Sequence, residues 1–459
     1  MEEHKAKKLT LETVREAVAK SAAGFRLTLK LEPASPKVFP PTYEGGKYAT
    51  EDRIINGQKV PCVLLDSVPS QANRMELALQ DAVEGALIEL PLVSVDFAAV
   101  NNPGVLKVTS LQAPHRIVDA ILRDSNVVRG EKVTRFRDSD IGQELGQLSA
   151  GYATPLLNYA PHCLLFGMWD STGPRGGLGV KFARAIVSEI VGVNAVPGVT
   201  TASRLDPLNI QKLVDKEDEE GVAIYHAQNG GWTMDKAVAK KDNQGKPKLY
   251  GKKGKPSEIN HGNVTPDIVY RRDKNRNLIL GDADRPVMMV VMDGDKADGH
   301  KYVIRDQVRP IPIGGFTIDY AEQTTVLSLP ALRRLRFPAK AGERSSPECD
   351  NVARTYLAAL GLLGATLAIE AGYDLRSRCI LRATDHVQWN LLGKPGDTDL
   401  PFTIDKDGAI DLYQEALGHV QKAKLPIHLD EVILMPSDDL VKLVKRSMEL
   451  AAAEAGEAN

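Results

Sequence analysis

The chain has 459 residues, a formal net charge of −2 and 43% hydrophobic residues. This balance predicts a soluble globular protein and excludes strong positive charge over the whole length, so any site for a polyanion must be local. The length exceeds the size at which one hydrophobic core usually stops growing. We therefore expect two domains, or one domain with large insertions.

The chain contains four isolated cysteines and no CxxC pair: Cys62, Cys163, Cys349 and Cys379. This pattern argues against a zinc site or a disulfide framework and favours a reducing compartment. The first residues, MEEHKAKK, are not followed by an apolar segment, so we expect no signal peptide. The expectation is a cytoplasmic protein that binds no metal and no cofactor.

The first hundred residues alternate between helical and strand patterns. In chain order we expect a helix over 10–23 capped by Thr10, strands over 25–31 and 60–65, a helix capped by Ser70 and a strand over 87–95. Gln71, Asn73 and Arg74 fall on the first turn after Ser70, where they suit contact with a phosphate backbone. A solvated surface is the plainer alternative.

The segment Thr109–Arg123 combines a turn with an amphipathic helix, and His115 and Arg116 lie at its beginning. A histidine in such a place is more often a surface or capping residue than a catalyst. Arg135 and Arg137 follow as a small basic cluster to which the sequence assigns no role.

The stretch Cys163–Val193 has the pattern of a strand, a glycine-rich loop and a helix. Cys163–Met168 is an apolar run of strand length. The helix is predicted from Leu178 onward because apolar residues recur at every fourth position. These residues are Leu178, Phe182, Ile186 and Ile190, and the loop before them holds Gly173, Gly176, Gly177 and Gly179.

Basic side chains surround this loop: Arg175 lies in it, and Lys181 and Arg184 follow on one face of the predicted helix. Glycines let backbone N–H groups approach a ligand, and a helix start carries partial positive charge, which favours phosphate. The loop lacks the ending of a P-loop and the spacing of a dinucleotide fingerprint. A polyanion along the surface therefore fits better than one nucleotide, and a turn that only packs strand against helix is the alternative.

A charged segment follows the turn-rich Ser203–Ile210. Lys236–Pro256 holds eight lysines against one acid, a net charge of +7, and we expect it to be a mobile basic arm that does not pack tightly. It reads as a nucleic-acid contact or as a solvated loop. Further on we expect a strand over 287–292, a β-type run and a short helix over 314–338, a buried helix over 351–372, a strand over 400–404, and helices over 411–422 and 437–453.

Catalytic patterns are sparse. Ser171 is not in a GxSxG elbow, and no histidine is placed for it by the sequence. Asp293, Asp295 and Asp298 form an acidic turn without the terminal glutamate of an EF-hand. The sequence therefore predicts no catalytic residue and no metal ligand.

Five segments, taken in order, carry a family resemblance: Leu65–Leu77 (LDSVPSQANRMEL), Ser110–Ser125 (SLQAPHRIVDAILRDS), Phe166–Gly192 (FGMWDSTGPRGGLGVKFARAIVSEIVG), Ser203–Ile210 (SRLDPLNI) and Gly314–Pro338 (GGFTIDYAEQTTVLSLPALRRLRFP). Together they resemble one group of CRISPR proteins, the backbone subunits of the Cascade effector in the type I-U (also called I-G) branch of the RAMP superfamily. Several long blocks match in order, so this resemblance is more specific than the glycine-rich loop alone.

The resemblance implies an α+β fold, a modified RRM-like (ferredoxin-like) palm with large insertions that include a thumb-like protrusion. Residues 1–459 would form a single RAMP-type domain, with 25–210 and 285–459 as its core and 211–284 as a charged insertion. The implied function is a CRISPR RNA-binding backbone subunit of a type I antiviral effector complex, stacked in multiple copies along the guide, and not an enzyme. The implied partners are CRISPR RNA, the target DNA strand through the guide, copies of the chain itself and other Cascade subunits, with no membrane.

RRM-type proteins usually stack bases on aromatic residues of the sheet, but aromatic residues make up only 5% of this chain. We therefore expect shape and phosphate contacts to dominate over base reading. The candidate RNA-binding residues are Gln71, Asn73, Arg74, His115, Arg116, Ser171, Thr172, Arg175, Gly176, Gly177, Lys181, Arg184 and Arg204. The alternative is a phosphate-handling enzyme that uses the Gly173–Gly179 loop.

Overall fold

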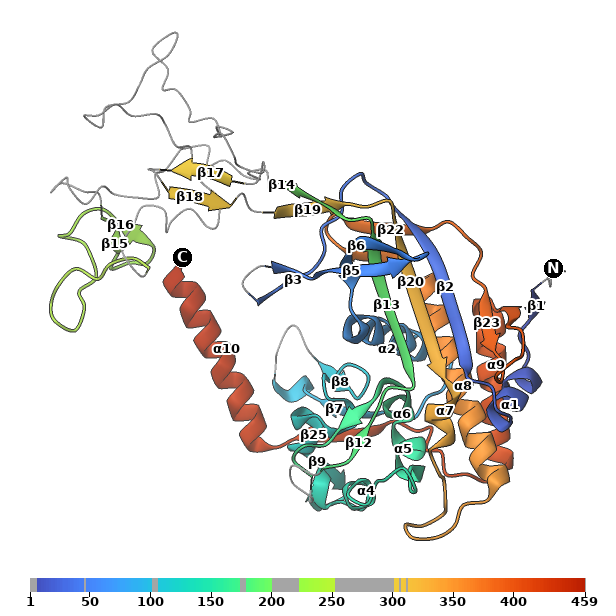
Figure 1. Cartoon of the computed structure of the whole chain (residues 1–459). Helices are drawn as coiled ribbons and strands as arrows, with labels where there is room; N and C mark the ends of the chain where they lie inside the picture. The colour runs from blue at the N-terminus through green and yellow to red at the C-terminus, as the bar shows by residue number, and fades with distance from the viewer. Residues whose placement is uncertain are drawn as a thin grey trace. The chain divides into compact units, whose positions relative to one another are not determined.

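The computed structural model describes residues 6–44, 47–100, 106–173, 179–199, 223–251, 301–304, 307–310 and 313–458. The chain divides into two compact units, the first made of Met1–Val196 with Phe316–Leu443 and the second of Pro197–Gly315 with Val444–Asn459. Helices and strands are mixed, so the fold is α+β (Figure 1). The expected charged insertion 211–284 falls within the second unit, and only its residues 223–251 are described.

The first unit is built on a ten-stranded sheet in which β22 and β21 branch from the path β1-β24-β23-β2-β20-β13-β6-β5. Its centre is antiparallel, because β20 pairs with β2 on one side and with β13 on the other. The strands are β1 (Lys7–Lys8), β2 (Gly24–Pro33), β5 (Thr50–Ile55), β6 (Gln58–Asp66), β13 (Ile186–Val193), β20 (Tyr320–Ser328), β21 (Tyr373–Arg376), β22 (Cys379–Ala383), β23 (Trp389–Leu392) and β24 (Leu400–Thr403).

Helices pack against this sheet around one apolar helix, α8 (Figure 1). The helices are α1 (Leu11–Ala19), α2 (Val68–Glu84), α7 (Leu329–Arg333), α8 (Pro347–Glu370) and α9 (Lys406–Lys422). A Cβ added to Gly361 would lie 3.3 Å from Leu327 of β20, and one added to Gly364 would lie 3.3 Å from Leu79 of α2. The two glycines therefore let α8 approach both neighbours closely.

Among the described residues, α8 is the single helix long and apolar enough to cross a membrane. However, 83% of its apolar window is buried inside the fold, as expected for a core helix. The prediction of a buried helix over 351–372 is confirmed.

A second, five-stranded sheet of the first unit has the order β10-β9-β25-β7-β8. Its strands are β7 (Val93–Asp96), β8 (Lys107–Thr109), β9 (Ser125–Arg129), β10 (Lys132–Arg135) and β25 (Val432–Pro436). Short helical segments surround it: η2 (Ala98–Val100), η3 (Arg116–Val118), α3 (Ala120–Arg123), η4 (Phe136–Asp138), α4 (Asp140–Leu145), α5 (Thr154–Tyr159) and α6 (His162–Phe166). Because β25 pairs with both β7 and β9, the sheet joins segments more than 300 residues apart.

The remaining elements are short pairs of strands and one long helix. The pairs are β3 (Thr42–Tyr43) with β4 (Lys47–Tyr48), β11 (Met168–Trp169) with β12 (Lys181–Phe182), β14 (Val196–Val199) with β19 (Ile313–Thr317), β15 (Tyr225–His226) with β16 (Trp232–Thr233), and β17 (Lys301–Ile304) with β18 (Gln307–Pro310). The long helix is α10 (Asp438–Ala458).

Within the second unit, part of the lysine-rich segment is folded. The amide of Tyr250 donates to the carbonyl oxygen of Ile224 at 3.0 Å, and Ala239 and Tyr250 are buried. The expectation that this segment does not pack is therefore wrong for residues 236–251, because Ala239 and Tyr250 are buried in a small core together with Ile224 and Tyr225. Residues 252–256 lie outside the described residues.

Several local predictions for the first unit are confirmed and others need correction. Thr10 caps α1, and the alternation of Phe25–Leu31 gives β2. The helix after residue 66 is capped by Ser67, not Ser70, since the Ser67 hydroxyl accepts the Ser70 amide. The helix predicted to follow a turn within 109–123 is interrupted, because Arg116 has a positive φ of 57° and only η3 and α3 form. The strand predicted over 287–292 lies outside the described residues.

Candidate nucleic-acid interface

The glycine-rich loop connects the two strands of a hairpin, not a strand to a helix. The apolar run that starts at Cys163 forms α6, and the chain then passes through β11, the loop and β12 into β13. Residues 174–178 of the loop lie outside the described residues, and these include Arg175, Gly176 and Gly177. No helix follows the loop, so the argument from a helix N-terminus does not hold here.

The spacing of apolar residues explains this error. Phe182, Ile186 and Ile190 are four residues apart, and an even spacing places them on one face of a strand as well as on one face of a helix. In the structure Ile186, Ser188 and Ile190 are buried, whereas Val187 is exposed. Pairing with β20 and β6 on either side selects the strand.

The base of the hairpin is held by a buried arginine. Arg116 forms two hydrogen bonds with the Glu76 carboxylate, at 2.6 and 2.8 Å, and donates a third to the carbonyl oxygen of Gly167 at 3.1 Å. Gly167 has a φ of 86°, and a Cβ there would meet the Phe182 carbonyl oxygen at 3.1 Å. The Arg116 guanidinium is therefore buried and holds the base of the hairpin through these three hydrogen bonds, and its contact with RNA stays a prediction.

A cluster of two arginines lies where β11 enters the loop. The Asp170 carboxylate accepts a hydrogen bond from Arg137 at 2.8 Å, and the Thr172 hydroxyl accepts from Arg137 at 3.0 Å and from Arg123 at 3.1 Å. A Cβ on Gly173 would lie 2.7 Å from the Asp170 carboxylate, so the loop is tight at this point. The cluster orders the start of the loop, and each guanidinium is paired with a carboxylate, Arg137 with Asp170 and Arg123 with Asp124.

A small cavity beside Asp170 is bordered by Arg123, Arg137 and the apolar side chains of Phe136 and Leu145. Its volume is about 20 Å³, which is enough for one water molecule and far too small for a nucleotide. The described part of the hairpin therefore presents a surface rather than a closed pocket.

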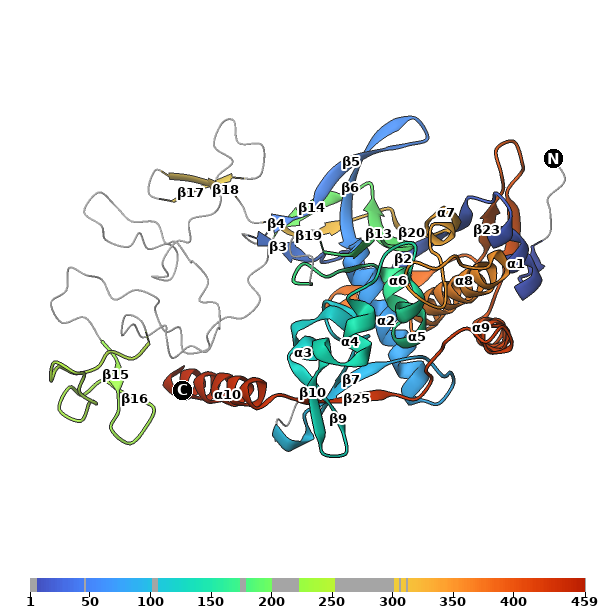
Figure 2. The same cartoon turned by 90° about the horizontal axis from the view of Figure 1, so that it is seen from below.

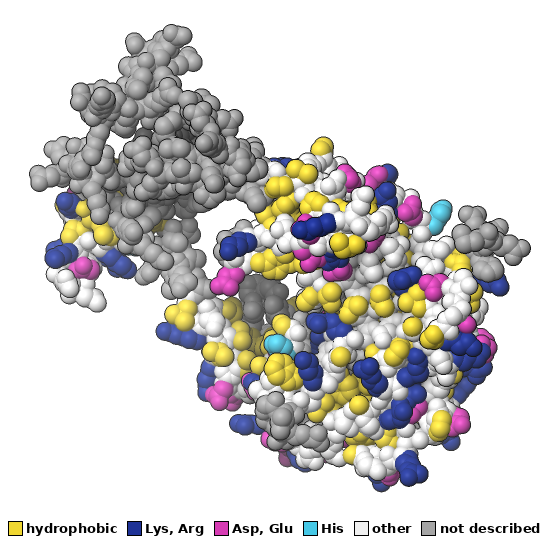
Figure 3. All heavy atoms as spheres, viewed as in Figure 1, with side chains coloured by type: hydrophobic (Ala, Val, Ile, Leu, Met, Phe, Trp, Pro, Cys, Tyr) yellow, Lys and Arg dark blue, Asp and Glu magenta, His cyan; other side chains and the backbone are white. Residues whose placement is uncertain are grey.

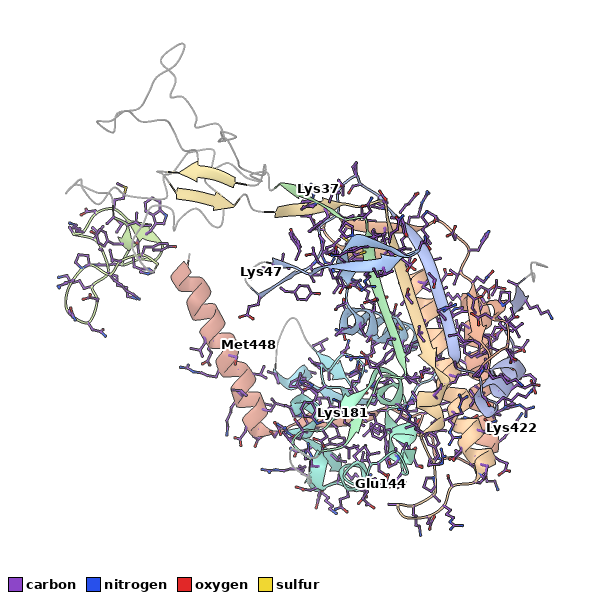
Figure 4. The ribbon with its side chains drawn as sticks, viewed as in Figure 1. Lys37, Lys47, Glu144, Lys181, Lys422 and Met448 are labelled. Carbon is purple, nitrogen blue, oxygen red and sulfur yellow. The ribbon has the colours of Figure 1, made fainter. Side chains whose placement is uncertain are left out.

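The hairpin exposes a tryptophan next to a lysine. Trp169 is 55% exposed, and it lies opposite Lys181 in the pairing of β11 with β12. The Lys181 ammonium lies 5.7 Å from the centre of the indole ring, within the range of a cation–π contact. Arg184 is exposed three residues further on, and Figure 4 labels Lys181 on its strand. We call Trp169, Lys181, Arg184, Arg123 and Arg137 the hairpin surface.

The residues of the first turn of α2 that were predicted to contact phosphate form hydrogen bonds within the fold. Gln71 is buried, and its amide donates to Asp66 at 2.7 Å while its oxygen accepts from Ser188 and Gln323 at 2.9 Å each. Arg74 donates to Asp66 at 2.9 Å and to the carbonyl oxygen of Leu375 at 2.8 Å. Gln71 and Arg74 are therefore held in one network around Asp66, and the phosphate contacts predicted for them stay predictions.

The other predicted residues are scattered. Asn73 on α2, His115 before η3, and Ser171 and Thr172 on the hairpin are exposed. Arg204 lies outside the described residues. The structure thus brings together Thr172, Lys181 and Arg184 with the support of Arg116, and leaves the residues of α2 apart.

Sequence reasoning missed three members of the hairpin surface. Trp169 directly follows the predicted strand 163–168, Arg123 ends the predicted helix over 109–123, and Arg137 belongs to a basic cluster without a role. An exposed tryptophan beside Asp, Ser, Thr and Gly is the one signal in the sequence that favours a surface position, because buried strands seldom end in such a run.

Positive side chains elsewhere on the visible face of the first unit are distributed rather than joined in one patch (Figure 3). Among the described residues, no three His, Cys, Asp or Glu side chains gather in a way that would hold a metal ion. The chemistry that the hairpin surface offers is therefore attraction of phosphate groups together with one aromatic face for stacking.

Comparison with known families gives one result. Residues 25–197 match a family described as CRISPR-associated protein GSU0053 (Cas_GSU0053). The matched range includes β2 from its second residue, all of α2, and both β11 and β12 of the hairpin, and it indicates a CRISPR-associated protein. No curated protein matches the chain.

Proposed function

We propose that this chain is a CRISPR RNA-binding backbone subunit of a type I effector complex of the I-U branch in the RAMP superfamily. Several copies stack along the guide, and each holds the guide by its backbone. The exposed Trp169 beside Lys181 is the observation that carries the proposal. A large aromatic side chain left in water beside cations is what a sequence-tolerant contact with single-stranded nucleic acid requires.

The side chains of the hairpin surface have two different roles, which follow from their exposure and hydrogen bonds. Lys181 and Arg184 are exposed and attract phosphates, while Arg123 and Arg137 keep the start of the loop in place through Thr172 and Asp170. Trp169 is 55% exposed beside Lys181, so part of its ring surface remains for a base. Base stacking thus adds to the phosphate contacts that the sequence led us to expect.

The order of elements supports a ferredoxin-like palm. Along the chain β2, α2, β13, β20, α8 and β22 follow one another as β-α-β-β-α-β. In the sheet, β22, β2, β20 and β13 are antiparallel neighbours. The β5–β6 hairpin and strands β7 to β10 of the five-stranded sheet are then insertions into the palm, and the part of the second unit from Pro197 to Gly315 is inserted between β13 and β20.

The proposed subunit is cytoplasmic and has no catalytic activity of its own. Its partners are CRISPR RNA, the target DNA strand paired to the guide, further copies of the chain and other Cascade subunits. Hydrolysis of RNA needs a bound metal or an activated nucleophile with a base beside it, and among the described residues no group of three His, Cys, Asp or Glu side chains could hold a metal ion.

Binding of a labelled single-stranded RNA at several salt concentrations tests the proposal. The wild-type protein should co-purify with RNA and leave the added RNA intact in the presence of magnesium. Lys181→Ala with Arg184→Ala should lower the slope of log affinity against log salt by about 0.7 for each phosphate that is no longer neutralised. Trp169→Ala should weaken binding roughly 5- to 150-fold, from about 1–3 kcal/mol per stacked base.

Lys422→Ala is the matched control, since Lys422 is an exposed lysine on α9 away from the hairpin (Figure 4). It should retain the wild-type affinity and salt slope. Hairpin variants that bind RNA like the Lys422→Ala protein would show that the hairpin surface is not the contact. Cleavage of the RNA that persists through purification would show that the chain is an enzyme.

A further inference from the structure

One face of the five-stranded sheet carries apolar side chains that the described structure leaves in water. Val133 of β10 lies opposite Val128 of β9, and Met435 of β25 lies opposite Asn126, two residues before Val128. Ile433 is two residues before Met435, so all four apolar side chains point to the same face. They are 39–61% exposed. We call Val128, Val133, Ile433 and Met435 the sheet patch.

The helix that follows β25 has an apolar side of its own. In α10, Leu440, Val444 and Met448 recur at every fourth residue, and Val441 lies beside them. None of the residues 438–450 is buried. The four apolar side chains of the stripe are half-buried, so within the described residues a 21-residue helix keeps an apolar side that is only partly covered, as in a typical interaction element. Figure 2 shows α10 as the continuation of the chain after β25.

The connection between β25 and the first turn of α10, which both belong to the first unit, is too short to turn that part of the helix back onto the patch of the same chain. Only Ser437 separates Pro436, the end of β25, from Asp438, the start of α10. Ser437 is itself part of the helix cap, because its hydroxyl accepts the Leu440 amide and its carbonyl oxygen accepts the Val441 amide. Connections that turn a helix back onto its own sheet usually take about two to six residues.

The charges of the two surfaces are complementary. The β9–β10 hairpin, residues 125–135, contains three basic residues and one acid, whereas the sequence of α10 contains five acids and three basic residues. Lys132 and Arg135 are exposed on the edge strand of the sheet. The acidic amphipathic helix α10 is therefore complementary in charge to the basic residues Lys132 and Arg135 at the edge of the sheet patch. RNA would be attracted by these basic residues but not by the four aliphatic side chains of the patch.

We propose that α10 of one copy of this chain packs its apolar stripe on the sheet patch of a second copy. The proposal deepens the proposed function, because it supplies the contact between copies that stack along the guide. The two surfaces are different, so the contact is head-to-tail and repeats from copy to copy. It is separate from the hairpin surface and does not need RNA to form.

Mixing two single-cysteine proteins tests this contact. Both proteins carry Cys349→Ser, because Cys349 is half-exposed and the other three native cysteines are buried. One protein also carries Val133→Cys, and the other carries Val444→Cys. A short thiol cross-linker should join the two different chains in the mixture, without RNA and with a synthetic guide. The matched control is Lys442→Cys, since two residues along a helix turn the side chain about 200° away from the stripe.

The contact is supported if Val444→Cys cross-links to Val133→Cys between chains and Lys442→Cys does not. The contact is overturned if neither mixture cross-links with or without guide. It is also overturned if RNA alone protects the introduced thiol of the Val133→Cys protein from labelling, or if a chain that carries both cysteine substitutions cross-links only within itself. In addition, Val133→Asp or Val444→Asp should weaken self-association by about tenfold or more with an unchanged melting temperature. Self-association as strong as in the wild type would contradict the contact.

These results separate this proposal from the proposed function. A protein that fails to bind RNA but still forms the cross-link between copies would refute the RNA-binding role alone. A protein that binds RNA through the hairpin surface but forms no cross-link would refute the contact alone.

Discussion

Replacing Arg116 separates a structural role from the RNA contact that the sequence predicted. The side chains of Arg116 and Glu76 are only 10% and 3% exposed, and they form a bidentate ion pair. Burial raises the pKa of the Glu76 carboxyl, and the hydrogen bonds from Arg116 act against this rise. Removing the guanidinium therefore leaves a buried acid that must either protonate or remain an uncompensated charge.

We expect Arg116→Ala to lower the free energy of unfolding by about 3–5 kcal/mol, the usual cost of breaking a buried pair from one side. The carbonyl oxygen of Gly167 also loses its donor, so the hairpin should loosen at its base. Arg116→Met combined with Glu76→Leu should recover most of the lost stability, because it removes both charges and keeps apolar volume.

Urea unfolding of the three proteins, followed by far-UV circular dichroism, gives the stability change. RNA affinity measured at a temperature where each protein is folded gives the binding change. If Arg116→Ala leaves unfolding unchanged but weakens RNA binding and lowers the salt slope by about 0.7, Arg116 contacts a phosphate and the reasoning from burial is refuted.

Two further predictions concern the first unit. Burial, helped by the charge of Arg116, lowers the pKa of His162 to about 3. Between about pH 6.5 and pH 3 the unfolded chain therefore holds a proton that the folded chain does not, and the free energy of unfolding should decrease as the pH is lowered, by up to about 1.4 kcal/mol per pH unit. In His162→Gln this slope should shrink in pH-dependent unfolding, and an unchanged slope would contradict the assignment. Arg333 donates hydrogen bonds to the carbonyl oxygens of Ala17, Val18, Lys20 and Ala22 at the end of α1. Arg333→Ala should therefore speed amide hydrogen exchange in that turn and lower the free energy of unfolding by about 1–3 kcal/mol. The control Arg334→Ala, at an exposed position, should change the free energy of unfolding by less than about 0.5 kcal/mol. Equal effects of the two arginine substitutions would show that Arg333 does not hold the end of α1.

Local patterns in the sequence were sufficient where short-range chemistry decides the outcome. Thr10 caps α1 through its own hydroxyl, and the alternation in Phe25–Leu31 gives a strand with one buried face. The long apolar run around residues 351–372 gives a buried helix. In each case the deciding interactions lie within a few residues, or depend only on which side chains avoid water.

Tertiary structure decided the features that depend on partners far along the chain. The four-residue spacing from Phe182 to Ile190 is compatible with a helix or a strand, and only pairing with β6 and β20 selects the strand. Arg116 and Gln71 are polar residues that the sequence places on a surface, yet Glu76, Ser188 and Gln323 satisfy them in the interior. Whether a polar side chain is free to meet RNA depends on hydrogen bonds that only the folded chain supplies, and burying such a group without them would cost too much free energy.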